Sequence, residues 1–253
     1  MNTKLFRLGF VLSVCFMVVI FSSAAHADDG VILINQDNAI AGIDSNDAPG
    51  FPVTISEPGS YRLSSNLNAG GQNGIVILVS DVTIDLNGFS IRGNAGLSVG
   101  IFADNRINHN LVGIVIRNGT ISNFDRGIDL ALSTQSIVER IGVHDNESWG
   151  IRVGENSTVT GNTASGNGRA GISVGNSSTV TGNTASNNFV GIEVGRDSTV
   201  SGNTASGNVG QEGIGLECPV NLLGNTALRN RGTDILEFPG LGNCTRNLNT
   251  PAP

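Results

Sequence analysis

A repeat of 20 or 21 residues is the feature that most constrains the fold of this chain. Residues 150–167, 171–188 and 191–208 share the pattern G-I-x-V-G-x-x-S-T-V-[TS]-G-N-T-A-S-x-N. Weaker copies begin at Gly213 downstream and at Gly127, Gly100 and Gly74 upstream. A fixed period of this length is typical of a solenoid, in which each unit stacks on the preceding one and burial runs along the whole stack.

The apolar positions within one unit fit three short strands. In the unit that begins at Gly150, Ile151 and Val153 alternate with polar residues, and Val159 and Ala164 follow. Such brief alternation, interrupted by Gly, Asn and Ser, favours strands separated by tight bends and leaves no room for a helix. Stacked coils, in which each strand pairs with its copy about 4.8 Å away, satisfy both the pattern and the period. The sequence therefore predicts an all-β parallel β-helix.

Asparagine recurs at one place in the units and predicts a stacked ladder. A turn asparagine tolerates left-handed backbone angles and can pass side-chain amide hydrogen bonds to the coils above and below. The predicted members are Asn87, Asn118, Asn162, Asn183, Asn203 and Asn225. One coil departs from this rule, because Arg140 and Ile141 stand where Gly and Asn are expected. We expect a locally altered turn there.

The G-I-x-V and G-N-T-A-S units resemble the repeats of right-handed parallel β-helix proteins of the pectin-lyase-like superfamily. Segments 81–88 and 115–120 resemble their early coils, and segment 55–63 resembles their N-terminal lead-in. The resemblance implies a single-stranded right-handed solenoid with short caps. It leaves the activity open, since this superfamily includes lyases, hydrolases, epimerases, sugar-binding modules and proteins without known chemistry.

The amino terminus has the layout of a cleavable secretory signal at residues 1–27. Lys4 and Arg7 precede an apolar run, and small residues then lead to the segment Ala-His-Ala at 25–27. The run is short for a membrane span, and Val14 stands before Cys15 where a lipobox requires a small residue. We therefore expect an exported protein, periplasmic or extracellular, without a membrane anchor.

The mature chain is expected to be one domain. Residues 28–72 fit an N-terminal cap with lead-in strands, residues 73–238 the coils, and residues 239–253 a C-terminal cap and tail. Cys218 and Cys244 are the only cysteines left after cleavage, and an oxidising compartment favours a disulfide between them. The alternative, a reactive or metal-binding thiol pair, lacks a nearby histidine and close C-x-x-C spacing.

Charge narrows the classes of partner. The formal net charge is −7, and cleavage would remove Lys4, which is the only lysine of the chain. Nucleic acid and anionic membranes are therefore poor partners for the mature protein. Any cationic chemistry must come from arginine. The sequence does not specify an oligomeric state.

The residue between the Ile and the Val of each unit's first strand is predicted to point outward and to form a surface column. The column contains Val76, Phe102, Asp129, Arg152, Ser173, Glu193 and Gly215. The simplest explanation is a solvated face whose charges contribute little stability. The resemblance adds a second explanation, because β-helix enzymes that act on polysaccharides carry their catalytic sites on this face and on the bends before it.

The most unusual residues of the chain occur in two of these bends, at 123–126 and 144–149. Trp149 is the only tryptophan, and its neighbouring carboxylates and arginines suit a sugar, although a buried or capping tryptophan is the commoner outcome. The predicted ligand-binding residues are Trp149, Asp125, Asp129, Glu147, Arg152 and Glu193.

An enzyme is the alternative to a binding module. A lyase or epimerase needs a base, and a cation to neutralise a uronate carboxyl, and the nominal candidates are His144, Asp145, Arg126 and Arg152. A hydrolase needs a carboxylate pair, such as Asp125 with Asp145 or Asp129 with Glu147. The arginine-rich, R-I-K and N-T-D motifs of active relatives are absent.

Metal and ice are weaker alternatives as ligands. His109 and His144 lack the spacing of zinc or copper ligands, so no metal site or cofactor is predicted, although calcium suits Asp125, Asp129 and backbone carbonyls. Three T-V-[TS] segments resemble ice-binding solenoids, but threonine also favours exposed strands for its own reasons. We therefore predict a binding or structural module with polysaccharide as its ligand, an enzyme acting on a uronate-containing polymer as the alternative, and an ice-binding-like solenoid as the third.

Overall fold

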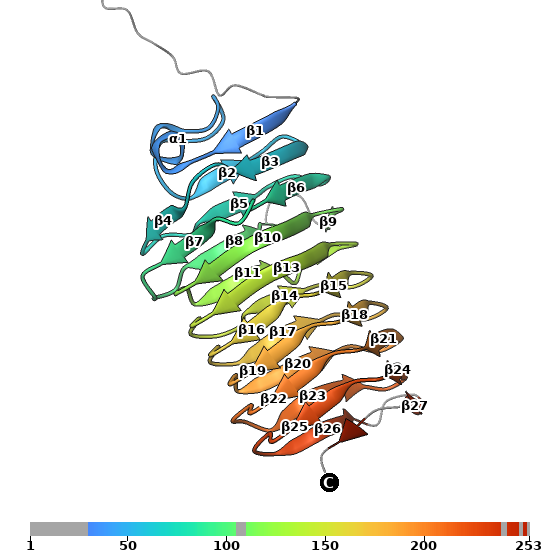
Figure 1. The fold of residues 1–253 in the computed structure, drawn as a ribbon. Coiled ribbons are helices and arrows are strands. Elements are labelled where there is room, and N and C mark those ends of the chain that lie inside the picture. Colours follow the sequence, from blue (N-terminus) through green and yellow to red (C-terminus); the bar gives the residue numbers. More distant parts are fainter. Residues whose placement is uncertain (1–29, 105–109, 239–241, 248–249, 252–253) are drawn as a thin grey trace, which may run out of the picture.

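The chain winds into a parallel β-solenoid in the computed structural model, which describes residues 30–104, 110–238, 242–247 and 250–251 (Figure 1). The predicted parallel, all-β solenoid is confirmed. The predicted signal at 1–27 and the loop histidine His109 lie outside the described residues. Within the described part, no helix is long and apolar enough to cross a membrane.

One wall of the solenoid is a nine-stranded parallel sheet, formed by the first strand of each coil. These strands bury Ile and Val side chains inward and present the residue between them outward. The strands are β2 (Val53–Ile55), β5 (Ile75–Ile77), β8 (Val99–Ala103), β11 (Arg126–Leu130), β14 (Ile151–Val153), β17 (Ala170–Val174), β20 (Val190–Val194), β23 (Glu212–Glu217) and β26 (Thr233–Phe238).

The two other walls merge into a seventeen-stranded sheet, because two long strands run through the bend that separates them. The long strands are β10 (Val115–Ser122) and β13 (Ile137–His144). One wall adds β1 (Val31–Ile34), β3 (Gly59–Leu63), β6 (Val82–Asp85), β15 (Thr158–Thr160), β18 (Thr179–Thr181), β21 (Ser198–Ser201), β24 (Val220–Leu223) and β27 (Thr245–Asn247). The other adds β4 (Leu67–Gly70), β7 (Ser90–Gly93), β16 (Thr163–Ser165), β19 (Thr184–Ser186), β22 (Thr204–Ser206), β25 (Thr226–Leu228) and β28 (Thr250–Pro251).

The regular stack begins earlier than the sequence boundary at residue 73. Strands β2, β3 and β4 pair in parallel with β5, β6 and β7, so they already form a coil. The N-terminal cover consists of β1, which pairs with β3, and of helix α1 (Gln36–Ala41), whose capping box joins Asn35 and Asn38. A two-stranded pair of β9 (Leu111–Val112) and β12 (Ser133–Thr134) lies outside the main walls.

The carboxyl-terminal coil is closed by a disulfide. Cys218 and Cys244 are bonded as predicted. Strands β27 and β28 continue the register of β24 and β25, which extends regular pairing into the predicted C-terminal cap. A link across 26 residues stabilises a fold by about 2–4 kcal/mol.

The core is a set of aliphatic files that run along the solenoid axis. Equivalent side chains from successive coils lie in register and are fully buried, and burying each of them contributes about 1.5–3 kcal/mol. The file from the nine-stranded sheet contains Ile128, Ile151, Ile172, Ile192 and Ile214. Because no single coil encloses a core, each coil depends on its neighbours for burial.

Four of the six asparagines predicted to form a ladder are joined in one file. The Nδ2 atoms of Asn162, Asn183 and Asn203 donate to the Oδ1 atom of the next asparagine at 2.9–3.0 Å, and the file ends at Asn225. The same Nδ2 atoms also donate to backbone carbonyl oxygens of Val138, Val159 and Val180. These buried amides are therefore fully engaged, and burying them carries no unpaired polar group.

Two further polar ladders, which the sequence alone did not distinguish, occupy the other bends. A second asparagine file ends on the carboxylate of Asp234 and contains Asn146, Asn167, Asn188, Asn208 and Asn230. A serine file contains Ser136, Ser157, Ser178 and Ser198, where each backbone N–H donates to the next hydroxyl. Each bend of the regular coils thus carries its own buried polar file.

Asn87 and Asn118 are corrections to the predicted ladder. Both have left-handed backbone angles, with φ of 51° and 61°. Asn118 aligns with Arg140, because the flanking pairs are Arg117 with Glu139 and Gly119 with Ile141. Its Nδ2 atom donates to Asp85 at 3.1 Å. In the coil of Asn118 the ladder position belongs to the next residue, Gly119, so the sequence alignment was displaced by one residue there.

The altered turn predicted at Arg140 is found in the strand pairing, because β13 runs through this bend whereas β15 and β16 of the next coil are separate strands, but the backbone angle is unchanged. Arg140 has a φ of 52°, which is close to the 63° of Gly161 at the equivalent bend of the next coil. The Arg140 side chain donates to Asn118 and Glu139, so the bend is kept without glycine. A second difference lies in the ladder, since the backbone N–H of Ile141 donates to Asn162 Oδ1 and ends the file.

Breaking the first ladder should cost several kcal/mol. In Asn183→Ala, the amide groups of Asn162 and the carbonyl of Val159 lose their partners, and each buried orphan costs about 1–3 kcal/mol. Urea denaturation of the purified variant measures the loss. The control Asn221→Ala, at an exposed strand position, should stay within about 0.5 kcal/mol of the parent. Equal effects of the two changes would contradict the ladder's role.

The bends offer a second stability test. Gly182 has a φ of +66°, and a methyl group at this position would meet no other atom within 4 Å. Gly182→Ala should therefore cost about 1–2 kcal/mol through backbone strain alone. Arg140→Gly relieves the same strain in another coil and loses only exposed contacts, so it should not destabilise the fold. Thermal and urea unfolding should show a lower free energy of unfolding for Gly182→Ala and no decrease for Arg140→Gly.

Candidate functional site

The outer face of the nine-stranded sheet carries the predicted surface column in register. Phe102 pairs with Asp129, Asp129 with Arg152, Arg152 with Ser173, and Ser173 with Glu193, one coil after another. A second file lies three residues before this column. It brings Arg126 and Trp149 to the same face. There Arg126 is ion-paired with Asp129 and lies over the ring of Trp149, which Arg152 also contacts. Charged and aromatic side chains therefore gather on this wall because the coils are in register.

Trp149 is surrounded by arginine. The guanidinium carbons of Arg126, Arg152 and Arg169 lie 5.5, 4.8 and 4.2 Å from the centre of its ring. A guanidinium over an indole ring gains about 0.5–2 kcal/mol, more when water is excluded. Trp149 is half-buried by these neighbours. The ring thus holds the arginine side chains in place and is only partly exposed.

The three arginines differ in their acidic partners. Arg126 is held between two carboxylates, with its Nη1 atom 2.6 Å from Asp129 and its Nε atom 3.2 Å from Asp125. In the described part of the chain, neither Arg152 nor Arg169 has a carboxylate oxygen within 4 Å. Two guanidinium groups are therefore oriented by the indole and remain available to an anion.

The nominal catalytic set does not come together. His144 Nδ1 lies 2.9 Å from Asp145, and both side chains are well exposed on the seventeen-stranded sheet. Arg126 and Arg152 lie on strands of the nine-stranded sheet, beyond the intervening bend. Glu147, which was considered for a hydrolase, accepts a hydrogen bond from the backbone N–H of Gly96. The proposed base and the proposed arginines therefore lie on different walls of the solenoid.

The two carboxylates considered for calcium are both bound to an arginine. Asp125 and Asp129 share the guanidinium of Arg126 as their partner, which occupies the position between them. Among the described residues, the only cluster of three metal-ligating types contains Cys218 and Cys244, whose sulfurs form the disulfide, with Glu237.

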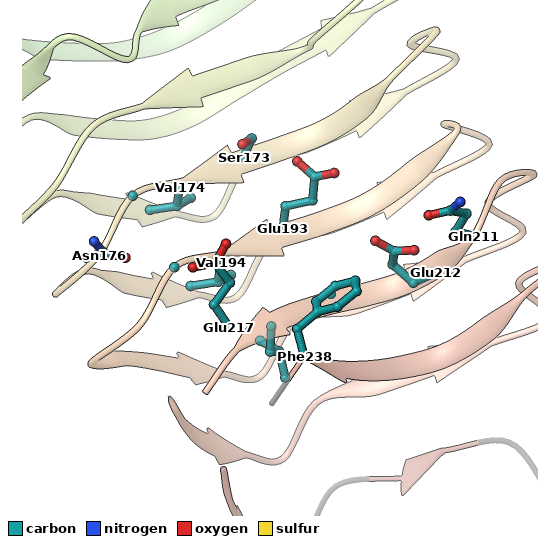
Figure 2. A pocket seen from close by; sticks show the side chains of 13 residues that line it. Ser173, Val174, Asn176, Glu193, Val194, Gln211, Glu212, Glu217 and Phe238 are labelled. Atoms are coloured by element: carbon teal, nitrogen blue, oxygen red, sulfur yellow. The ribbon is translucent and has the colours of Figure 1, made fainter. Parts of the chain in front are cut away.

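A cavity of about 460 Å³ opens on the same face, further toward the carboxyl terminus. Figure 2 shows Glu193, Glu212 and Phe238 extending into this region from β20, β23 and β26. Glu217, Gln211 and Asn176 contribute to the rim. The cavity therefore has an acidic and partly aromatic lining, within the size range of small-ligand sites.

The two central glutamates of this cavity hold protons more tightly than ordinary glutamates. Burial raises the pKa of Glu193, and a hydrogen bond from Ser173 and the charges of Arg169 and Arg152 offset this only in part. Burial also raises the pKa of Glu212, and the charge of Glu193 adds to the effect. Glu212 is only 4% exposed.

Sequence reasoning missed Arg169 and Glu212. Arg169 precedes the strand and is not part of the outward column, so its reach back to Trp149 depends on the coil-to-coil distance. Glu212 had a readable signal, since it stands two residues before Ile214 where Ala170 and Val190 precede the equivalent isoleucines. A charge where the two preceding units carry an apolar residue marks a departure that packing alone does not require.

The threonine face covers a limited area. Thr158, Thr179 and Thr199 are in register, and the hydroxyls of Thr181 and Ser201 lie 3.1 Å apart. The next coil replaces the outward pair with Asn221 and Leu223. The hydroxyl file therefore spans three coils and is continued by a mixed surface.

The geometry defines a class of protein: a parallel β-solenoid with a charged face on its nine-stranded wall. The sequence matches the family described as "Right handed beta helix region" over residues 21–210, so the chain belongs to the right-handed β-helix family. The predicted resemblance to right-handed β-helix proteins is thereby confirmed. No curated protein and no solved structure matches the chain.

Raised glutamate pKa values make a pH-dependent contribution to stability. A carboxyl whose pKa is higher in the folded than in the unfolded state stabilises the fold fully below its unfolded pKa of about 4.3. That contribution is lost as the pH rises through the folded pKa. Glu212→Gln keeps a neutral group in place, so its stability relative to the parent should increase between about pH 4 and pH 8.

Urea denaturation across this pH range measures the difference between parent and variant. The control Glu57→Gln removes an exposed carboxylate outside the cavity. A Glu212→Gln difference that is flat with pH would contradict the raised pKa.

Proposed function

We propose that this chain is an exported β-helix module that binds a uronate-containing polysaccharide along the outer face of the nine-stranded sheet. The observation that carries the proposal is the pair of guanidinium groups, from Arg152 and Arg169, that lie against Trp149 without a carboxylate partner in the described structure. The disulfide between Cys218 and Cys244 fits an oxidising compartment outside the cytosol.

Arginine is the residue type best suited to a sugar acid. Its planar guanidinium can donate two parallel hydrogen bonds to one carboxylate. Stacking on Trp149 restricts the side chains of Arg152 and Arg169 before the ligand arrives, so less conformational entropy is lost on binding. Since the whole chain is acidic, this cluster is also the part of the face where a polyanion is least repelled.

The shape of the face favours a polymer. Equivalent positions recur about every 4.8 Å along the axis, and the registers carry polar outward side chains from Asp129 to Glu193 without interruption. Extended solenoid surfaces of this kind contact long ligands over several repeats. A polysaccharide can therefore lie along the stack with one sugar acid at the arginine cluster.

The alternative function is a lyase, epimerase or hydrolase acting on such a polymer. One observation favours it: Glu193 and Glu212 have raised pKa values, which is the property of a carboxyl that serves as a general acid. Incubation with polyuronates, with and without calcium, tests this directly by ultraviolet absorbance of unsaturated products and by a reducing-end assay. Product formation that Glu212→Gln abolishes would favour the enzyme.

Binding can be followed through the single tryptophan of the chain, since Trp149 is the site's own fluorophore. Titration with polygalacturonate or alginate should shift its emission, whereas a neutral glucan should not. Arg152→Ala and Arg169→Ala should each weaken polyuronate binding about tenfold, equivalent to about 1.4 kcal/mol, and the binding should weaken with added salt.

The matched control is Arg62→Ala, which removes an equal charge from an exposed position on the seventeen-stranded sheet. It should leave the affinity unchanged. Affinity gel electrophoresis gives a readout that is independent of fluorescence. Equal weakening by all three substitutions would mean that only net charge matters, and the proposed site would be rejected.

A further inference from the structure

The acidic cavity exists because one coil lacks an outward side chain. Gly215 occupies the column position held by Ser173 and Glu193 in the two preceding coils. A methyl group at Gly215 would lie 2.8 Å from Glu212 Oε1, so the Glu212 side chain lies over the gap that the glycine leaves. Two glutamates from neighbouring strands thus line one hollow.

One oxygen of these carboxyl groups has no internal partner. Glu212 Oε2 is buried and accepts no hydrogen bond within the described structure, although Glu212 is only 4% exposed. A buried oxygen without a partner costs about 1–3 kcal/mol, more if the carboxyl is charged. Ser56 Oγ, Ser98 Oγ, Arg126 Nε and Arg196 Nε are also buried without a hydrogen-bond partner in the described structure, but only Glu212 of this group lines the cavity, where a ligand can supply the missing donor.

We propose that this cavity binds the protonated amine of an amino sugar, held between Glu193 and Glu212. An ammonium group donates three hydrogen bonds, so it can serve Glu212 Oε2 and Glu193 at once. Glu217 on the rim is paired with Arg196, whose Nε atom lies 3.6 Å from Glu217 Oε2, so the charge available to an ammonium comes from Glu193 and Glu212. The half-exposed ring of Phe238 offers an apolar surface for a sugar ring and a weak cation–π contact.

A metal ion fits this cavity less well. The described residues bring three metal-ligating side chains close together only at Cys218, Glu237 and Cys244, not here. Calcium takes six to eight oxygen ligands, whereas the cavity centres on two glutamates. The volume of about 460 Å³ and the exposed phenyl ring also suit an organic group better than a bare ion.

The acidic cavity extends the proposed polysaccharide face. Arg152 and Arg169 are close enough to act on the charge of Glu193, so the anion-binding cluster and the acidic cavity are neighbours on one wall. This choice of an amino sugar over another organic cation rests on the proposed polysaccharide function. A polymer that carries both uronate and unacetylated amino sugars would match both regions.

Two oligosaccharides of equal length provide the test: a glucosamine tetramer with free amines and its fully N-acetylated counterpart. Isothermal titration calorimetry of the mature protein, without polyuronate, should show at least tenfold tighter binding of the free amine. Glu212→Gln should weaken that binding at least tenfold. Gly215→Ala keeps every charge but displaces the Glu212 carboxyl, and should weaken it severalfold.

Controls separate this proposal from the first. Glu57→Gln removes an exposed carboxylate elsewhere and should leave amine binding unchanged. Arg169→Ala should not weaken amine binding, even though it weakens polyuronate binding, so each proposal can fail alone. Circular dichroism verifies that each variant is folded. Equal affinity for the two tetramers, no heat with either, or calcium chloride alone binding in a Glu212-dependent manner would overturn the amine site.

Discussion

Register between successive coils is the constraint on which the rest of this structure depends. Each strand hydrogen-bonds to its copy in the next coil, and that parallel pairing places like residues over like. Isoleucine files then fill the interior, and the buried amides of Asn162 and Asn183 find partners in the neighbouring coil. A displacement of one residue would turn aliphatic side chains outward and leave the amides unpaired. Burial and polar satisfaction therefore specify the same register.

The same register turns single residues into surfaces. An outward position that is repeated in every coil becomes a column, and its chemistry depends on where the units depart from their consensus. Around Trp149 the departures are arginines, and around Gly215 they are glutamates and a missing side chain. Opposite charges are thus concentrated on one wall of the solenoid. Function on such a scaffold is expected at these departures, because the consensus residues are already engaged in holding the stack.

The energetic logic explains why the two proposed regions differ in character. The Arg126 guanidinium is ion-paired internally with Asp125 and Asp129, so its charge is already balanced within the fold. Arg152 and Arg169 are oriented by an aromatic ring, which supplies attraction without neutralising their charge. Glu212 shows the opposite situation, since burial has removed water from a carboxyl without replacing all of its hydrogen bonds.

The sequence by itself determined the parallel solenoid, its repeat, the outward column from Val76 to Gly215 and the disulfide, because each follows from period and alternation or from cysteine count. Only the tertiary structure decided which residues meet across coils. It showed that Asn118 lies outside the ladder and that His144 ends a strand of the seventeen-stranded sheet. It also placed Arg169 against Trp149, and Glu212 close enough to Glu193 for their charges to interact. The physical reason is that a one-dimensional repeat states which positions are equivalent, whereas the bends decide how far a long side chain reaches and which wall it faces.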